Sequence, residues 1–201
     1  REEAFESDGT TRVRVLFDPA VAPGGYAYLF TVGGRGTIGC AIVRDLGGID
    51  GYFERAKERL LSIEAVPVEA PRDAYSFMNF ALVPEARRDG RPAAGEAGAF
   101  QDYLFGLGMR YAISSGALAA EALLSGEDFA ALARARFSRR QRVSLVNRFL
   151  YEAAGSLGLS LFARLAAHLD FRAVLAGFYR PGPVRLALAR REVRRGERVG
   201  P

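Results

Sequence analysis

Residues 26–43 read YAYLFTVGGRGTIGCAIV, two runs of aromatic and β-branched residues separated by a cluster of glycines. Runs of this kind favour β-strands, and glycines between them favour a tight turn, so the stretch predicts a hairpin. Upstream, residues 12–17 (RVRVLF) show the alternation of a half-buried strand, and a turn rich in proline and glycine follows them. The sequence therefore predicts three antiparallel strands over residues 11–44.

Downstream of the hairpin the apolar period changes from that of a strand to that of a helix. Asp50 is suited to cap a helix in which Phe53, Ala56 and Leu60 fall on one face. Residues 74–83 (AYSFMNFALV) then predict another strand.

The second part of the chain has a helical pattern. Residues 108–124 are almost all small or apolar, which predicts a helix buried on most sides. From Asp128 the helical pattern continues nearly to the end, with breaks predicted at residues 155–158, at Asp170 and at residues 181–183. A sheet followed by helices predicts an α+β fold.

Composition excludes several classes of protein. The 201 residues are 49% hydrophobic, enough for a sizeable core, and the single cysteine rules out an intramolecular disulfide. No apolar run reaches the ~20 residues that a membrane-spanning helix needs. The chain starts at Arg1, unlike an initiator methionine or a signal peptide, so we expect it to begin partway through a longer, cytoplasmic protein.

We assign structural roles to several residues whose types can also take part in binding or catalysis. Residues 34–39 match the G-x-G-x-x-G pattern but continue into the strand-like residues 40–43, so we interpret them as a hairpin turn and not a dinucleotide site. We expect Cys40 to be buried and inert, and His168 to be a capping or surface residue. The sequence shows neither metal-ligand spacing nor a G-x-S-x-G nucleophile.

Two runs of arginine account for much of the net charge of +5. We interpret both as solvated helix faces and expect no nucleic acid partner, with an anionic membrane surface or nucleic acid as the alternatives. The runs are Arg134, Arg136, Arg139, Arg140 and Arg142, and Arg190, Arg191, Arg194, Arg195 and Arg198.

A glycine-rich loop at residues 95–108 runs into the small-residue helix predicted after it. Such a loop can bring bare backbone amides against a flat or anionic ligand. The pyrimidine edge of a flavin fits this description, because the reduced ring gains negative charge that N–H donors and the helix dipole stabilise. The alternative is that the small residues only allow close helix packing.

The runs GEAGAFQD at residues 95–102 and LFGLGMRYAISSGALAAEAL at 104–123 resemble the second flavin-binding motif of the geranylgeranyl reductase family and its relatives with the p-hydroxybenzoate hydroxylase type of fold. Residues 25–30 (GYAYLF) are similar to the same family's Y-x-[WY]-x-F segment, which lines the substrate side of the flavin. The resemblance spans residues 23–125. Thr31 and Tyr103 depart from it, since the family usually has proline there.

The resemblance implies FAD as the cofactor. It places Gly95, Glu96, Ala97 and Gly98 along the ribityl and pyrophosphate part, with Glu96 as an acceptor for ribityl hydroxyls, and Gly106, Leu107, Gly108 and Met109 against the isoalloxazine ring. It assigns the walls of the substrate cavity to Tyr26, Tyr28 and Phe30, with Tyr103 reshaping the pocket near the flavin. It divides the chain into a substrate-side sheet domain (1–94), a flavin-binding loop and helix (95–125) and a helical region (126–201).

The function implied is FAD-dependent oxidation or reduction of an apolar small molecule or lipid, including the reduction of isoprenoid double bonds. Tyr26, Tyr28 and water are the candidate proton donors. The family's nucleotide-binding half is missing from the sequence, so we expect the chain alone to bind FAD weakly and to be inactive. The alternatives are a flavin-dependent monooxygenase, or a non-enzymatic module that binds an acidic surface through its arginine-rich helices, with peripheral membrane contact if the substrate is a lipid.

Overall fold

The structure is a computed structural model that describes residues 1–78 and 86–166, together with residues 170, 173, 176, 177, 179, 180, 182–184 and 187. The chain divides into two compact units, Arg1–Phe77 and Met78–Pro201. Ala86 belongs to the core of the second unit, and the predicted division of roles into residues 1–94, 95–125 and 126–201 stays a prediction.

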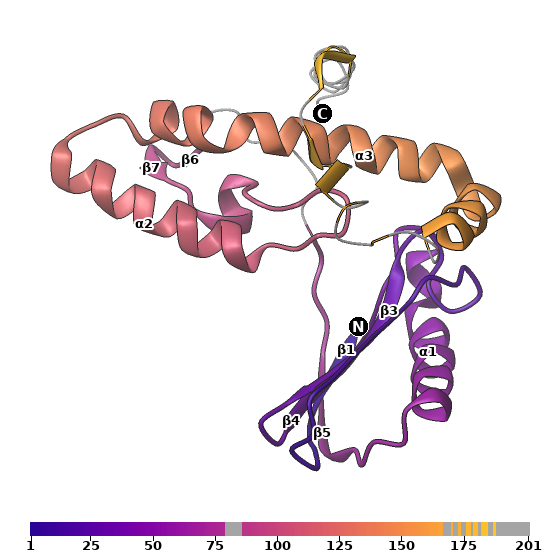
Figure 1. Cartoon of the computed structure of the whole chain (residues 1–201). Coiled ribbons are helices and arrows are strands. Elements are labelled where there is room, and N and C mark those ends of the chain that lie inside the picture. Colours follow the sequence, from indigo (N-terminus) through magenta and orange to yellow (C-terminus); the bar gives the residue numbers. More distant parts are fainter. Residues whose placement is uncertain are drawn as a thin grey trace. The chain divides into compact units, whose positions relative to one another are not determined.

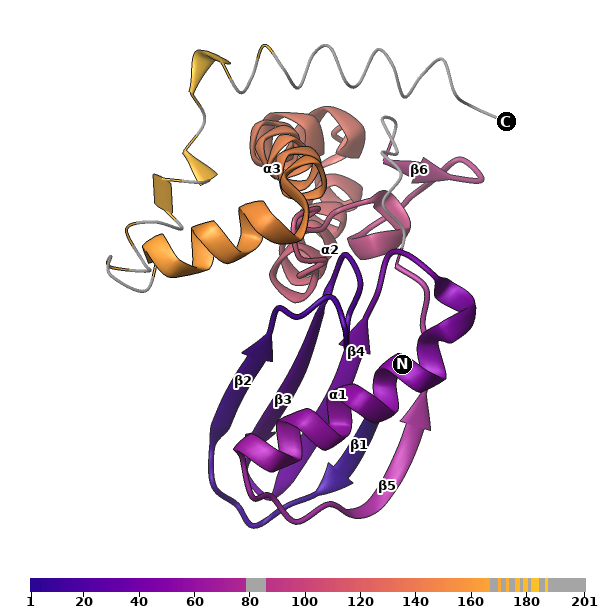
Figure 2. The ribbon, with the colours of Figure 1, turned by 90° about the vertical axis from the view of Figure 1, so that its right-hand side faces the viewer.

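The first unit is built on a five-stranded sheet with the order β2-β3-β4-β1-β5, in which all neighbours are antiparallel (Figure 2). The three predicted strands are confirmed, and two further strands extend the sheet beyond them. The strands are β1 (Glu2–Glu6), β2 (Arg12–Leu16), β3 (Tyr26–Val32), β4 (Arg35–Ala41) and β5 (Glu69–Ala74).

A tight turn joins β3 to β4. Val32 pairs with Arg35 across Gly33 and Gly34, whose φ angles of 57° and 79° suit glycine. Residues 34–39 therefore lie in this turn and in β4, so the G-x-G-x-x-G pattern does not open a helix and its interpretation as a hairpin turn is confirmed.

Helix α1 (Ile49–Ile63) covers one face of the sheet (Figure 2). Its apolar residues Phe53 and Leu60 are fully buried, as are Leu29 and Ile38 on the strands beneath. The predicted amphipathic helix is confirmed, and its burial of apolar surface holds this layer to the sheet.

The strand predicted at residues 74–83 is wrong over the part that the structure describes. Strand β5 ends at Ala74, and residues 75–78 have no regular structure, while residues 79–83 lie outside the described residues. Ala74 pairs with Glu2, the first residue of β1, so the chain beyond it has no partner on this edge of the sheet.

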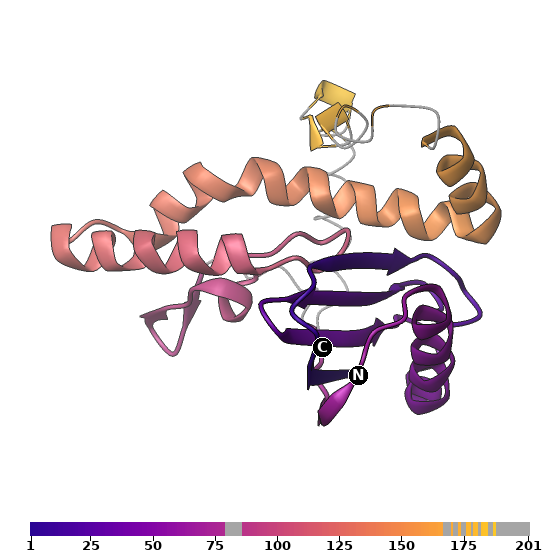
Figure 3. The same cartoon turned by 60° about the horizontal axis from the view of Figure 1, so that its bottom comes forward.

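The second unit is mainly helical. Its two long helices run side by side (Figures 1 and 3) and bury an aromatic core that includes Phe100, Tyr111 and Phe137. The elements in chain order are β6 (Arg87–Arg88), β7 (Arg91–Pro92), the 3₁₀ turn η2 (Gly95–Gly98), α2 (Met109–Ser125) and α3 (Phe129–Ala166).

The helix predicted at residues 108–124 is confirmed as α2, but it is not buried on most sides. Tyr111 and Leu118 lie on its buried face, whereas Met109, Ile113 and Leu124 are 84%, 75% and 90% exposed. Only the residues that recur at helical spacing on one face can pack against a single neighbouring helix, so small apolar residues elsewhere on α2 stay open in the described part of the chain.

The predicted break after residue 154 is confirmed inside α3. Gly155 has φ 58° and ψ −166°, which joins two helical segments across a kink. The surroundings of the breaks predicted at Asp170 and at residues 181–183 lie largely outside the described residues. Within the described residues, no helix combines the length and the apolarity that crossing a membrane requires.

Candidate functional site

The loop between η2 and α2 closes around a buried carboxylate. Asp102 is 6% exposed, and its Oδ2 accepts a hydrogen bond from the Phe105 amide at 2.9 Å while its Oδ1 accepts one from the Ser144 hydroxyl. The Gly106 amide donates to the Asp102 carbonyl at 2.8 Å, and the Asp102 amide donates to the Leu107 carbonyl at 3.1 Å. The acid of the GEAGAFQD run therefore shapes the loop from inside.

Helix α3 anchors the same loop through two buried polar side chains. Ser144 Oγ accepts hydrogen bonds from the backbone amides of Tyr103 and Leu104 at 2.6 and 3.1 Å. Gln141 Nε2 donates to the Ala99 carbonyl at 2.7 Å. Neither role follows from the sequence, in which Gln141 stands within the arginine run and Ser144 lies between Val143 and Leu145.

The two halves of the predicted cofactor set lie at the same end of α2. The Gly95 amide donates to the Ser115 hydroxyl of α2 at 2.8 Å, and a Cβ on Gly95 would lie 3.3 Å from the Cβ of Ala112. Turn η2 thus packs against the first turns of the helix whose N-terminus follows Gly108. Glu96 and Ala97, in the middle of η2, are exposed.

Three of the four glycines in the predicted set are required by the loop's own packing. Gly95 has a φ of +58°. A Cβ on Gly98 would lie 2.0 Å from the Ala93 carbonyl oxygen, and Gly106 has a φ of +69°. The backbone conformation and the packing of the loop therefore account for these three glycines.

Gly108 is different, because nothing in the described chain requires glycine there. Its φ of −104° is open to any residue, and the nearest atom to a Cβ at this position is Gln101 Cβ at 4.0 Å. The N–H groups of Leu107, Gly108 and Met109 have no hydrogen-bond acceptor among the described residues. They precede or begin α2, where helix amides carry partial positive charge.

A row of aromatic side chains lies on the face of the sheet opposite α1 in the first unit. Tyr26, Tyr28 and Phe30 alternate with residues such as Leu29 that face α1, so they lie on the opposite face and are half-buried. The ring centroids of Phe17 and Tyr26, Tyr26 and Tyr28, and Tyr28 and Phe30 are 6.0, 6.0 and 5.1 Å apart. The Y-x-[WY]-x-F segment thus forms one continuous apolar surface.

Tyr28 is fixed within this row by its neighbours. Its hydroxyl donates to Glu2 Oε2 at 2.7 Å, and a Cβ on Gly39 would lie 2.3 Å from its Cζ. Burial, and then the hydrogen bond to the Glu2 carboxylate, raise the pKa of Tyr28 above its ordinary value. Its proton is therefore held firmly, which disfavours Tyr28 as a proton donor to substrate.

Tyr103 lies in the core of the second unit with no exposed surface. Its hydroxyl donates to the Ala99 carbonyl at 2.8 Å, and burial raises its pKa. In this position Tyr103 packs beneath the loop. A role beside the substrate stays a prediction, and the burial of Tyr103 disfavours it.

The remaining candidate residues are accounted for in part. Cys40 is buried in β4, as predicted; its thiol donates to the Val21 carbonyl at 3.1 Å and burial raises its pKa to about 11, which supports the prediction that it is inert. His168 lies outside the described residues. Among the described residues no group of acidic, histidine and cysteine side chains could hold a metal ion.

The first arginine run lies on α3, and the second lies outside the described residues. All five members of the first run, Arg134, Arg136, Arg139, Arg140 and Arg142, are exposed, as a solvated face requires.

No protein-family model and no curated protein sequence matches this chain. Among solved structures, the chain is similar to a geranylgeranyl bacteriochlorophyll reductase-like protein from Thermoplasma acidophilum, with a TM-score of 0.54 and 18% sequence identity. The match covers 92% of this chain and 53% of that protein, so this chain spans about half its length. The match confirms the α+β fold and the predicted resemblance to the geranylgeranyl reductase family at the level of the fold.

Proposed function

We propose that this chain is part of an FAD-dependent oxidoreductase that acts on an apolar small molecule, with the reduction of an isoprenoid double bond as the reaction that the resemblance suggests. The observation that carries the proposal is Gly108, a glycine that nothing among the described residues requires, flanked by backbone amides that have no acceptor among those residues. A flat, electron-rich ligand that approaches the backbone closely would explain both features.

The residues of the loop would hold the cofactor in two groups. The N–H groups of Leu107, Gly108 and Met109 would meet the pyrimidine edge of the ring, where the positive end of α2 favours negative charge. The exposed Glu96 would accept hydrogen bonds from ribityl hydroxyls. When bound, a flavin supplies two-electron redox chemistry, and the chain's part is to orient the ring and to stabilise charge on it.

The aromatic row is the proposed apolar wall for the substrate. Its half-buried rings offer the kind of surface that a water-insoluble molecule prefers. Because the Tyr28 hydroxyl donates a hydrogen bond to Glu2, we assign proton delivery to Tyr26 or to water. The division of roles into residues 1–94, 95–125 and 126–201 is part of this proposal, as is a nucleotide-binding half outside this chain that would hold the adenine of FAD.

The proposal is tested with riboflavin, which carries the ring and the ribityl chain without a phosphate group. Amide chemical shifts of the 201-residue chain are followed by NMR during a riboflavin titration, a method that detects weak binding. We expect shifts concentrated on residues 106–109. A Gly108→Leu variant should lose them while keeping its melting temperature, because the added side chain blocks the backbone and its Cβ would lie 4.0 Å from the nearest atom, Gln101 Cβ.

Gly47→Leu is the matched control, since a Cβ at Gly47 also meets nothing within 4 Å but lies in the first unit. This control should bind riboflavin like the unaltered chain. Shifts that are absent, that spread over other residues, or that survive in Gly108→Leu would overturn the proposal.

A further inference from the structure

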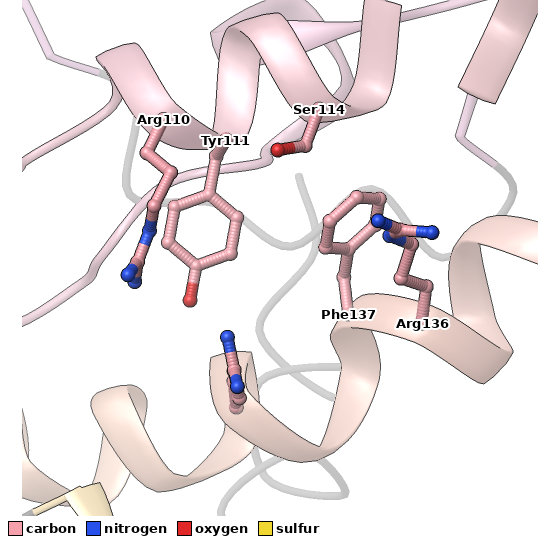
Figure 4. A pocket seen from close by; sticks show the side chains of 6 residues that line it. Arg110, Tyr111, Ser114, Arg136 and Phe137 are labelled. Atoms are coloured by element: carbon pink, nitrogen blue, oxygen red, sulfur yellow. The ribbon is translucent and has the colours of Figure 1, made fainter. Parts of the chain in front are cut away.

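A cavity of about 280 Å³ opens between α2 and α3 within the second unit (Figure 4). The Tyr111 ring and the Ser114 side chain point from α2 toward α3, and Phe137 meets them from the other side. The cavity is lined by Arg110, Tyr111 and Ser114 of α2 and by Arg136, Phe137 and Arg140 of α3.

The three arginines of this cavity have no carboxylate within ion-pair distance among the described residues. Elsewhere in the same unit Arg87 pairs with Asp128 at 2.9 Å. Arg136 and Arg140 are four residues apart on one helix, where like charges repel each other. The cavity therefore concentrates positive charge that the described chain leaves unneutralised.

The buried carboxylate of Asp102 lies close enough to affect this cavity electrostatically, and it already has hydrogen-bond donors of its own. Asp102 contributes to the electrostatic environment of Tyr111, but its oxygens accept hydrogen bonds from the Ser144 hydroxyl and the Phe105 amide. Arg110 is the second residue of α2, so the partial positive charge of the helix N-terminus adds to that of its guanidinium.

The floor of the cavity is aromatic and its rim is basic. The rings of Tyr111 and Phe137 are both buried, with centroids 5.9 Å apart. The hydroxyls of Tyr111 and Ser114 supply neutral hydrogen-bonding groups beside the guanidinium forks.

We propose that this cavity binds the phosphate or diphosphate group of a phosphorylated small molecule. Three guanidinium groups around one hollow match an anion with several oxygens and more than one negative charge, because each fork can bind two oxygens. A single carboxylate would leave most of that charge unpaired. Nucleic acid is recognised by cations that follow an extended backbone, whereas these three line one cavity of about 280 Å³.

The experiment titrates inorganic pyrophosphate into the 201-residue chain by isothermal titration calorimetry at low and at high salt. The test variant is Arg136→Gln with Arg140→Gln. The matched control is Arg134→Gln with Arg139→Gln, which removes the same charge from the same helix outside the cavity. We expect binding that weakens with salt, that falls at least about tenfold in the test variant, and that stays within about twofold in the control.

The proposal is overturned if pyrophosphate does not bind. It is also overturned if pyrophosphate affinity falls equally in the two variants, because only the overall charge then matters. Tighter binding of citrate than of pyrophosphate would overturn the phosphate assignment. If the chain binds an RNA oligonucleotide in a salt-sensitive way and both variants lose this binding equally, the arginines form a nucleic acid face instead. Circular dichroism checks that all variants are folded.

A second arm distinguishes the two sources of such a group. Vesicles of phosphatidylcholine containing phosphatidic acid are compared with vesicles containing the same charge as phosphatidylserine. Retention on phosphatidic acid alone, displaced by pyrophosphate, assigns the group to a lipid headgroup, whereas pyrophosphate binding without vesicle retention assigns it to a soluble molecule. The assays contain no flavin, so their outcome is independent of the proposed function.

Discussion

The replacement Ser144→Ala tests the reasoning on which the candidate site depends, because one hydroxyl holds three parts of the loop. Ser144 Oγ accepts from the Tyr103 and Leu104 amides and donates to Asp102, and all of these groups are buried. Alanine removes the oxygen and leaves its partners in place.

The expected loss of stability follows from the partners left behind. Two buried backbone N–H groups lose their acceptor, at about 1–3 kcal/mol each, so the free energy of unfolding of the second unit should fall by about 2–6 kcal/mol. Asp102 also loses a donor, although its Oδ2 retains the Phe105 amide at 2.9 Å. A water molecule in the vacated space would move the loss toward the lower end of this range.

The measurement is urea unfolding followed by far-ultraviolet circular dichroism, which the helices of the second unit dominate. Because the two units can unfold separately, amide hydrogen exchange of residues 103 and 104 is measured as well. Ser138→Ala, on the same helix and without a hydrogen bond from its hydroxyl in the described chain, should change stability by less than about 0.5 kcal/mol. If Ser144→Ala changes stability and exchange as little as Ser138→Ala does, the anchoring of the loop by α3 is refuted.

Two further predictions concern the sheet. Gly39→Ala should destabilise the first unit by about 1–3 kcal/mol in urea unfolding, because the added Cβ would lie 2.3 Å from Tyr28 Cζ. The control Gly47→Ala should leave stability almost unchanged, because a Cβ at Gly47 meets nothing within 4 Å. Equal effects of the two replacements would show that the contact with Tyr28 is unimportant. Cys40 should resist a disulfide reagent at pH 8 and react fully in guanidinium, because its raised pKa of about 11 keeps the thiol neutral in the folded chain. The stabilisation from burying that neutral thiol is complete below the ordinary cysteine pKa and is lost as pH rises through about 11. Fast labelling of the folded chain at pH 8 would contradict this.

Elements with strong local signals were predictable from the sequence. The β3–β4 hairpin follows from β-branched and aromatic runs around Gly33 and Gly34, and α1 follows from apolar residues at helical spacing. The kink at Gly155 follows from the permissive backbone of glycine. Each of these signals acts over a few residues, so the sequence contains it directly.

Elements that depend on distant partners were not predictable. Strand β1 reads EEAFE and β5 reads EAPRDA, and neither has the composition of a strand. They are strands because the backbone of β1 pairs with β4 and β5, far away in the sequence. Non-local pairing overrides local propensity in these two strands.

The sequence by itself determined the kinds of residue available at the candidate site: a glycine-rich loop before a helix, an aromatic row on one strand, and a run of arginines. Only the tertiary structure decided which loop glycines serve packing and which one, Gly108, does not. It also decided that Arg110 joins Arg136 and Arg140 at one cavity, from two helices. The physical reason is that burial, the absence of an acceptor for an N–H donor, and a shared cavity are properties of atoms brought together from distant parts of the chain, and the order of residues does not record those distances.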